Sequence, residues 1–481
     1  MQKRTGFMLL VFSLVLIAQG SLAVLPTSAD EATVELVSFT NDAYGIQGVA
    51  PAGWEEMEEG YFVRGSSATD GVSLTYQFFP TMTIDWATSS LILPELGLAA
   101  MPESGGSLET PAFTWSLYSI ELATNGGGTA VMDLALAENE SGVYLVKFLS
   151  GGDEYASLHE AVFLPAVEAL ETIETADSDF SYEENRSLFD YDPSAPLDIQ
   201  EEGSRRYRYG GYTQTNFTYA SPKGGRVPAT IYAPDGEGPF AGIIIMHGSG
   251  GNQTDFYWLA KSYVVTGAVV MLITAPESRP GGAIEIGAPF IGIWNPEQQI
   301  QLIVDLRRAV DLLIARPDVD PGRLGYIGFS YGGAQGGLLA GVENRLQAYS
   351  LMSGDGGWIT HVTGIEGEDG FLRDCLADVQ PSLGLEACED WLARMHPIES
   401  WRFVHYAAPA ALLFQSGLRD QMVPIADAVP YQRAGSEPKT ILWYDSEHQL
   451  PAQAFQDQAE WLQQYIGIDA ASFQPPNPWD W

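Results

Sequence analysis

The chain has few basic residues and, beyond its first residues, no long hydrophobic run. Its 481 residues include 23 lysines and arginines against 62 aspartates and glutamates, a formal net charge of −39. Such a balance argues against binding of nucleic acid or of anionic membrane surfaces, because both need positively charged patches. No later apolar stretch reaches the roughly 20 residues that a transmembrane helix needs. The charge says nothing about a reaction.

Cysteine is also scarce, since the chain has only Cys375 and Cys388, close together in sequence. No histidines lie near them at ligand spacing, so they do not indicate a zinc site. In an exported protein we expect them to form a disulfide, and two buried thiols are the alternative.

The N-terminus has the features of an export signal. Lys3 and Arg4 precede an apolar core at residues 7–18, and Ser21-Leu22-Ala23 offers small residues for cleavage. We expect residues 1–23 to be a signal peptide. The mature protein would then be secreted, periplasmic or on the cell surface, with no membrane association after cleavage. An uncleaved anchor is the alternative.

Residues 31–172 have the pattern of a small α+β domain. Short β-prone runs and two helical stretches alternate in it, and no catalytic cluster is apparent. The predicted strands are 34–39, 44–49, 60–64, 72–79, 114–122, 129–137 and 143–148, and the predicted helices are 84–98 and 154–171. We interpret this part as an accessory domain. The acidic residues 173–205 after it are predicted to be a linker, or a strap on the next domain.

Residues 206–470 alternate strands and helices, which predicts a mainly parallel sheet. The predicted strands are 213–220, 226–233, 240–246, 267–274, 324–329, 346–352, 410–415 and 440–444. Residues 354–406 interrupt this pattern and are predicted to be a helical cap insertion, and residues 471–481 a C-terminal tail. Functional groups in such sheets gather at the carboxyl ends of the strands.

Residues 328–333 read Gly-Phe-Ser-Tyr-Gly-Gly between a predicted strand and a predicted helix. A serine there, with glycines two positions before and after it, is typical of a nucleophile elbow. The glycines remove side chains that would collide with the neighbouring backbone. The turn would expose the Ser330 hydroxyl beside amides at a helix N-terminus, which can bind a negative oxygen.

From about residue 190 to 467 the chain resembles the α/β-hydrolase family, in its dienelactone-hydrolase-like and acetyl-xylan-esterase-like branch. The resemblance implies an α/β-hydrolase fold and a triad of Ser330, Asp420 and His448, in that order along the chain. Asp420 follows a predicted strand and precedes Val423-Pro424. Asp355, after the preceding strand, is the other candidate for the acid. A dienelactone hydrolase proper would have cysteine at position 330.

The same resemblance implies two backbone donors of an oxyanion hole, the amides of Tyr331 and Ser249. Ser249 belongs to a glycine-rich loop, residues 247–251, directly after a buried strand. His247 begins this loop. Since the family has its catalytic histidine last, we interpret His247 as a structural residue.

These residues predict a secreted serine hydrolase that cleaves small-molecule carboxylic esters through an acyl-enzyme, with no metal or organic cofactor. One alternative is a serine peptidase of the prolyl-oligopeptidase-like kind, although residues 31–172 are too few for its β-propeller. Another is a noncatalytic binding module on a hydrolase scaffold, against which an intact triad argues. The sequence indicates neither the natural ester nor the oligomeric state.

Overall fold

The computed structural model describes residues 34–41, 44–58, 60–64, 71–80, 83–96, 98–123, 128–139, 142–173, 180–363, 372, 375 and 384–475. The chain divides into two compact units, an N-terminal unit of residues 1–177 and a C-terminal unit of residues 178–481. The predicted signal peptide lies outside the described residues, as do the end of the tail and part of the predicted cap. Among the described residues, no helix is both long and apolar enough to cross a membrane.

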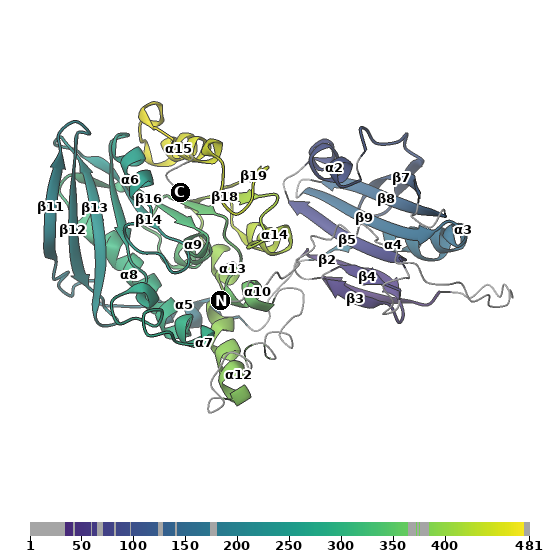
Figure 1. The fold of residues 1–481 in the computed structure, drawn as a ribbon, viewed down its shortest axis with the longest axis horizontal. Helices are drawn as coiled ribbons and strands as arrows, with labels where there is room; N and C mark the ends of the chain where they lie inside the picture. Colours follow the sequence, from purple (N-terminus) through teal and green to yellow (C-terminus); the bar gives the residue numbers. More distant parts are fainter. Residues whose placement is uncertain are drawn as a thin grey trace. The chain divides into compact units, whose positions relative to one another are not determined.

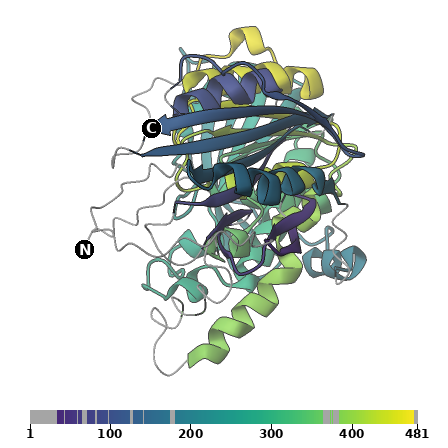
Figure 2. The ribbon, with the colours of Figure 1, turned by 90° about the vertical axis from the view of Figure 1, so that its right-hand side faces the viewer.

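The N-terminal unit is built on a seven-stranded antiparallel sheet with the order β3-β4-β5-β9-β8-β7-β6. A second sheet has the order β1-β2-β10. Figure 2 shows the long strands of this unit in blue. The strands are β1 (Leu36–Asn41), β2 (Ile46–Pro51), β3 (Glu55–Glu58), β4 (Tyr61–Val63), β5 (Ser73–Pro80), β6 (Gly106–Glu109), β7 (Thr114–Ala123), β8 (Thr129–Asn139), β9 (Gly142–Gly151) and β10 (Glu171–Thr172).

Two helical stretches complete this unit, and each contains a π-helical segment. The first runs through α1 (Ile84–Ala87), Thr88–Ile92 and α2 (Leu93–Leu96), and the second through α3 (Tyr155–Leu158), His159–Phe163 and α4 (Leu164–Glu168). Trp115, Leu134 and Phe148 from the sheet and Val162 from the second stretch are fully buried. The predicted α+β character of this part is confirmed.

The C-terminal unit contains a nine-stranded sheet with the order β11-β12-β13-β15-β14-β16-β17-β18-β19 (Figure 1). The strands are β11 (Gln200–Tyr207), β12 (Tyr212–Ala220), β13 (Arg226–Pro234), β14 (Phe240–Met246), β15 (Ala268–Ile273), β16 (Val319–Phe329), β17 (Ala348–Met352), β18 (Ala411–Gly417) and β19 (Lys439–Tyr444). From β15 to β19 all neighbouring strands are parallel, whereas β11, β12 and β13 pair antiparallel. The predicted mainly parallel sheet is confirmed.

Helices cover both faces of this sheet. One hydrophobic core contains residues of α8 and α9 such as Leu306 and Leu338, and the other contains Leu259 of α6 and Leu462 of α15. The helices are α5 (Tyr182–Arg186), α6 (Tyr257–Val264), α7 (Phe290–Ile293), α8 (Pro296–Ile314), α9 (Tyr331–Val342), α10 (Trp358–Thr363), α12 (Gly384–Met395), α13 (Ser400–Val404), α14 (Ile425–Ala434) and α15 (Ala452–Ile466). Apolar strands such as β14 and β15 are buried because helices pack on both sides of them.

The predicted linker, residues 173–205, is in large part integral to the C-terminal unit. Phe189 is fully buried in its core, and the Tyr182 hydroxyl donates a hydrogen bond to the Gly341 carbonyl oxygen (2.6 Å). Tyr191 similarly donates to Asp311 of α8 (3.0 Å). Of the two predictions for this segment, these contacts agree with a strap that lies on the C-terminal unit. The sheet itself begins at Gln200, before the predicted boundary at 206, because β11 pairs with β12 although its own side chains are mostly exposed.

The predicted cap, residues 354–406, contains α10, α12 and α13, while residues 364–371, 373–374 and 376–383 lie outside the described residues. Helix α12 extends away from the rest of this unit in both ribbon views (Figures 1 and 2). The predicted disulfide is present and joins Cys375 to Cys388 of α12. Helix α13 is instead part of the core, because Phe403 is fully buried and packs closely on Gly341 of α9.

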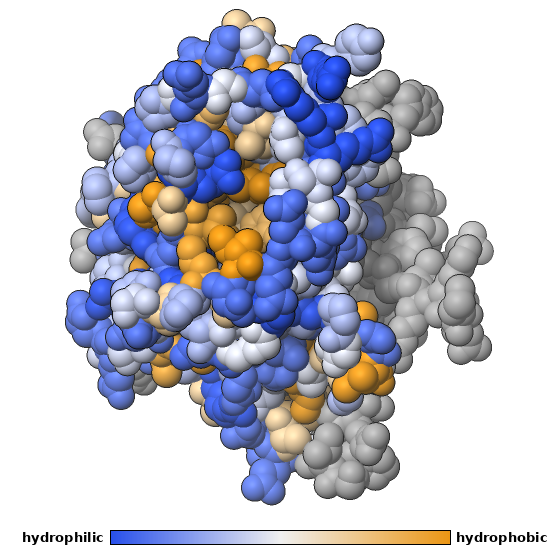
Figure 3. Space-filling view, turned by 90° about the vertical axis from the view of Figure 1, so that its left-hand side faces the viewer, coloured by the Kyte–Doolittle hydropathy of each residue, from blue (hydrophilic) through white to orange (hydrophobic). Residues whose placement is uncertain are grey.

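The side of the C-terminal unit that carries β11 is mostly hydrophilic, with hydrophobic residues gathered in a hollow (Figure 3). The mostly hydrophilic character of this face agrees with a chain that has 62 acidic residues. At the start of the predicted tail, Phe473 is buried and its ring lies 4.8 Å from that of Tyr263.

Candidate active site

Ser330 lies between β16 and α9 with a backbone conformation of φ 54° and ψ −116°. Three glycines make this turn possible. A Cβ atom on Gly328 would collide with the backbone of Gly332, and one on Gly332 would lie 2.6 Å from the Met246 carbonyl oxygen. A Cβ atom on Gly333 would lie 2.5 Å from the Met352 carbonyl oxygen. The local structure is therefore the strand-turn-helix arrangement of a nucleophile elbow.

The candidate oxyanion donors lie beside this turn. Tyr331 is the first residue of α9, so its amide has no acceptor within the helix. Ser249 lies in the loop after β14, and the loop passes close to the elbow, since a Cβ atom on Gly248 would be 3.4 Å from the Ser330 Cβ. Ser249 and Ser330 both line the same pocket. The two amides are thus in a region where a negative oxygen on a substrate could be bound.

His247 has the hydrogen bonds of a structural residue. Its Nε2 accepts from the Ala275 amide (3.1 Å), so its Nδ1 carries the hydrogen and donates to the Gly248 carbonyl oxygen (2.7 Å). Burial lowers the pKa of His247, which keeps the ring neutral. Both nitrogens are occupied, as expected from the interpretation of His247 as a residue that shapes the loop.

His448 and Asp420 lie in contact after neighbouring strands. His448 Nδ1 is 2.7 Å from Asp420 Oδ2. The other oxygen of this buried carboxylate accepts hydrogen bonds from the amides of Met422 (2.8 Å) and Val423 (2.9 Å). These bonds hold Asp420 in the orientation that fixes the tautomer of His448, with a hydrogen on Nδ1 and a lone pair on Nε2.

Several contacts bring His448 to the elbow. Its ring lies 5.1 Å from the ring of Phe329, the residue before Ser330. The Ser353 hydroxyl donates to the His448 carbonyl oxygen (2.9 Å), and the Ser330 amide donates to Met352, the neighbour of Ser353 (2.8 Å). Within the described part of the chain His448 Nε2 is buried and has no hydrogen-bond partner. A buried basic nitrogen beside the elbow is suited to receive a proton.

Asp355, the other candidate acid, contacts a different histidine. Its Oδ2 lies 2.8 Å from Nδ1 of His361, and its Oδ1 accepts from the Gly357 amide (3.2 Å). The structure therefore contains two aspartate–histidine pairs near the elbow. The sequence did not indicate the second pair, although Asp355 and His361 follow a strand end and stand six positions apart, which was the available signal.

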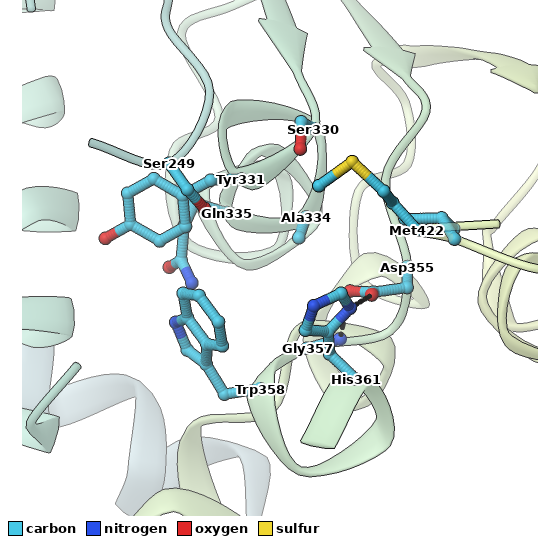
Figure 4. Close-up of a pocket in the computed structure, with 11 residues that line it drawn as sticks. Ser249, Ser330, Tyr331, Ala334, Gln335, Asp355, Gly357, Trp358, His361 and Met422 are labelled. Carbon is cyan, nitrogen blue, oxygen red and sulfur yellow. Dashed lines mark hydrogen bonds and ion pairs between the residues drawn. The ribbon is translucent and has the colours of Figure 1, made fainter. Parts of the chain in front are cut away.

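Ser330 opens into a pocket with a cavity volume of about 40 Å³ (Figure 4). Its lining residues are Ser249, Ser330, Tyr331, Ala334, Gln335, Asp355, Gly357, Trp358, His361, Met422 and Val423. In Figure 4, Ser330 lies at one end and Trp358 and His361 lie at the other. By the same measure a single water needs roughly 10–15 Å³, so the pocket accepts a group of a few non-hydrogen atoms.

The aromatic side chains of Tyr331 and Trp358 line this pocket, and Trp294 packs against both of them. The rings of Trp294 and Trp358 are stacked with centroids 4.4 Å apart, and Tyr331 lies 5.2 Å from Trp294. The Oε1 atom of buried Gln299 accepts from the Tyr331 hydroxyl (2.7 Å) and from Trp358 Nε1 (3.1 Å). Gln299 therefore fixes two aromatic residues at once, a role that sequence reasoning missed because it depends on contacts between distant segments.

Among the described ranges, no three His, Cys, Asp or Glu side chains come together in a way that could bind a metal ion.

No family model and no curated protein matches the chain. Similar solved structures include an acetyl xylan esterase from Paenibacillus sp. R4, at 18% identity and TM-score 0.49, over 60% of this chain and 96% of that one. Acetyl xylan esterase 1 from Thermoanaerobacterium sp. JW/SL YS485 also has 18% identity and a TM-score of 0.49, over 61% and 94%. An S-formylglutathione hydrolase from Agrobacterium tumefaciens has 13% identity and a TM-score of 0.41, over 56% and 100%.

Proposed function

We propose that the protein is an exported serine hydrolase that cleaves carboxylic esters of short acyl groups. The observation that carries the proposal is the elbow at Ser330 together with the His448–Asp420 pair beside it. The small pocket at Ser330 supports the restriction to short acyl groups. The signal-like residues 1–23 and the Cys375–Cys388 disulfide support export.

In this proposal Ser330 Oγ attacks the ester carbonyl carbon while His448 Nε2 takes the hydroxyl proton. Asp420 holds the imidazole in the required tautomer and stabilises its positive form. The amides of Tyr331 and Ser249 donate to the carbonyl oxygen as it becomes negative. The tetrahedral intermediate then collapses: its carbon–oxygen bond to the leaving group breaks as His448 protonates that oxygen, which releases the alcohol and leaves an acyl group on Ser330.

The second half of the reaction repeats these steps with water. His448 removes a proton from a water molecule, which attacks the acyl carbon and forms a new tetrahedral intermediate. Collapse of this intermediate returns the proton to Ser330 Oγ and releases the carboxylic acid.

A substrate panel tests the proposed reaction. Purified protein is assayed on p-nitrophenyl esters from acetate to octanoate and on peptide p-nitroanilides, with Ser330→Ala as the control. We expect kcat/KM to be highest for acetate or propionate and to fall as the acyl chain outgrows the pocket. Cleavage of peptide anilides in preference to esters, or the same rates with Ser330→Ala, would overturn the proposal.

A further inference from the structure

The wall of the pocket that faces Ser330 carries a second histidine. His361 lies on α10 three positions after Trp358, so both side chains are on the same face of this helix. Both line the pocket, and Figure 4 shows His361 with Asp355 across the cavity from Ser330. A group bound at Ser330 and extending through the cavity therefore meets His361.

Asp355 determines which nitrogen of His361 is available to a ligand. Asp355 Oδ2 contacts Nδ1 of His361 at 2.8 Å, and only 5% of the Asp355 side chain is exposed. Since the two nitrogens lie on different sides of the ring, Nε2 points away from Asp355. About 35% of the His361 side chain remains exposed, which leaves Nε2 accessible for a further hydrogen bond.

The start of α10 is held firmly in place. The buried carboxylate of Glu399 accepts a hydrogen bond from the Ile359 amide (3.1 Å). Gly357 has φ 138°, and a Cβ atom there would lie 2.5 Å from Glu399 Oε1. The Trp401 amide donates to the Gly356 carbonyl oxygen (2.8 Å). These contacts fix the position from which His361 reaches the pocket.

His361 is positively charged at neutral pH. Burial lowers its pKa, but the hydrogen bond to Asp355 and the negative charges of Asp355, Asp427 and Asp420 outweigh this effect and raise the pKa to about 9. With Nδ1 bonded to Asp355, the protonated ring offers Nε2–H as a donor and has no lone pair to act as a base.

We propose that His361 donates a charge-assisted hydrogen bond from Nε2 to a carboxylate on the substrate, and that the enzyme prefers half-esters of short dicarboxylic acids. This inference rests on the proposed ester hydrolysis at Ser330. The ester carbonyl would lie at Ser330 and the free carboxylate at the opposite end of the cavity. Among the described residues that line the pocket, His361 is the only basic one.

The neighbouring carboxylates could repel a carboxylate on the substrate, but their negative charges are already stabilised by other groups. Asp355 is paired with His361, and Asp420 is bonded to His448 and to two amides. Asp427 lies in the first turn of α14, where the helix amides favour a negative charge.

A binding experiment tests the inference without turnover. In a Ser330→Ala background, the dissociation constants of monoethyl succinate and of ethyl levulinate, a neutral ester of similar size, are measured by calorimetry at pH 7. We expect the half-ester to bind about tenfold more tightly, and His361→Gln to remove this difference. His405→Gln, at an exposed histidine outside the pocket, is the matched control and should keep it. Equal binding of the two esters would overturn the inference.

Kinetics on the Ser330 enzyme separate this inference from the proposed function. We expect the ratio of kcat/KM for monoethyl succinate over ethyl levulinate to exceed one at pH 7 and to decline as the pH rises through about 9, because His361 then loses its proton. The substrate carboxylate stays ionised over this range. Hydrolysis of ethyl levulinate without preference for the half-ester contradicts only the inference. No hydrolysis of either ester or of p-nitrophenyl acetate contradicts the proposed function, and the binding result then still decides the inference.

Discussion

At Ser330 the backbone adopts φ 54° and ψ −116°, a region that costs a non-glycine residue about 1–3 kcal/mol. The surrounding backbone imposes this conformation. The Ser330 amide donates to the Met352 carbonyl oxygen (2.8 Å), and the Gly332 amide donates to the His247 carbonyl oxygen (3.1 Å). The turn is thus tied to β17 and to the loop after β14, so the serine is oriented before any substrate binds.

A substitution at Gly328 tests how tightly this turn is packed. Gly328→Ala should destabilise the protein by roughly 3 kcal/mol, because the new methyl group collides with the backbone of Gly332. Urea unfolding of the variant and of wild type measures the difference. Gly203→Ala is the control, since nothing lies within 4 Å of a Cβ atom there, and we expect a change within about 0.5 kcal/mol. Equal effects of the two substitutions would show that the elbow is not constrained in this way.

The two aspartate–histidine pairs predict different consequences for the loss of each carboxylate. Asp420→Asn should lower kcat for p-nitrophenyl acetate on the order of 10⁴-fold, because His448 would take the wrong tautomer. Asp355→Asn should cost much less, because Asp355 contacts His361 and not His448. The two kcat values are compared at matched thermal stability. A larger loss with Asp355→Asn would mean that the acid is on the earlier strand.

The site residues that the sequence predicts differ from those that it did not indicate in how local their signals are. Ser330 is recognisable from its immediate neighbours, and Asp420 and His448 from their places after two strands. Gln299 has no such local signal, and the signal for His361 is limited to its place six positions after Asp355. Their roles depend on how α10 and α8 meet at the pocket, which only the folded arrangement provides.

Among the secondary-structure elements, buried strands were the easiest to predict. β14 spans the residues predicted for it, and β18 and β19 agree with prediction within one or two residues at either end. β11 was missed because most of its side chains are exposed and polar, so no alternation marks it as a strand. It is formed by pairing with β12, which is a tertiary contact. β6 also has mainly exposed residues and was missed for the same reason.

We expect the disulfide to contribute measurably to the free energy of unfolding. It joins Cys375 to α12 across 13 positions, and closing a loop of about this length stabilises a protein by roughly 3 kcal/mol. The double variant Cys375→Ala/Cys388→Ala should lose up to this amount in urea unfolding. Wild type treated with reductant provides the control and should behave like the double variant. If oxidised wild type and the double variant were equally stable, the bond would have no role in stability.

Because the whole chain divides into two units, we expect the proposed hydrolysis to need only the C-terminal unit. Ser330, Asp420, His448 and the described residues that line the pocket all belong to the C-terminal unit. We therefore expect a fragment of residues 178–481 to fold and to hydrolyse p-nitrophenyl acetate with a kcat within about tenfold of that of the full chain, since no group of the proposed reaction is removed. Circular dichroism verifies that the fragment is folded. A folded but inactive fragment would mean that the N-terminal unit contributes to the reaction.

The proposed function depends on Ser330 being an activated nucleophile. Treatment of the purified protein with a fluorophosphonate, followed by intact-mass measurement and peptide mapping, tests this most directly. We predict one adduct per chain, on Ser330, and none on the Ser330→Ala variant. We also predict that His448→Ala labels far more slowly than wild type, because the hydroxyl loses its base. Labelling of another residue, or equal labelling of the Ser330→Ala variant, would contradict the proposed function.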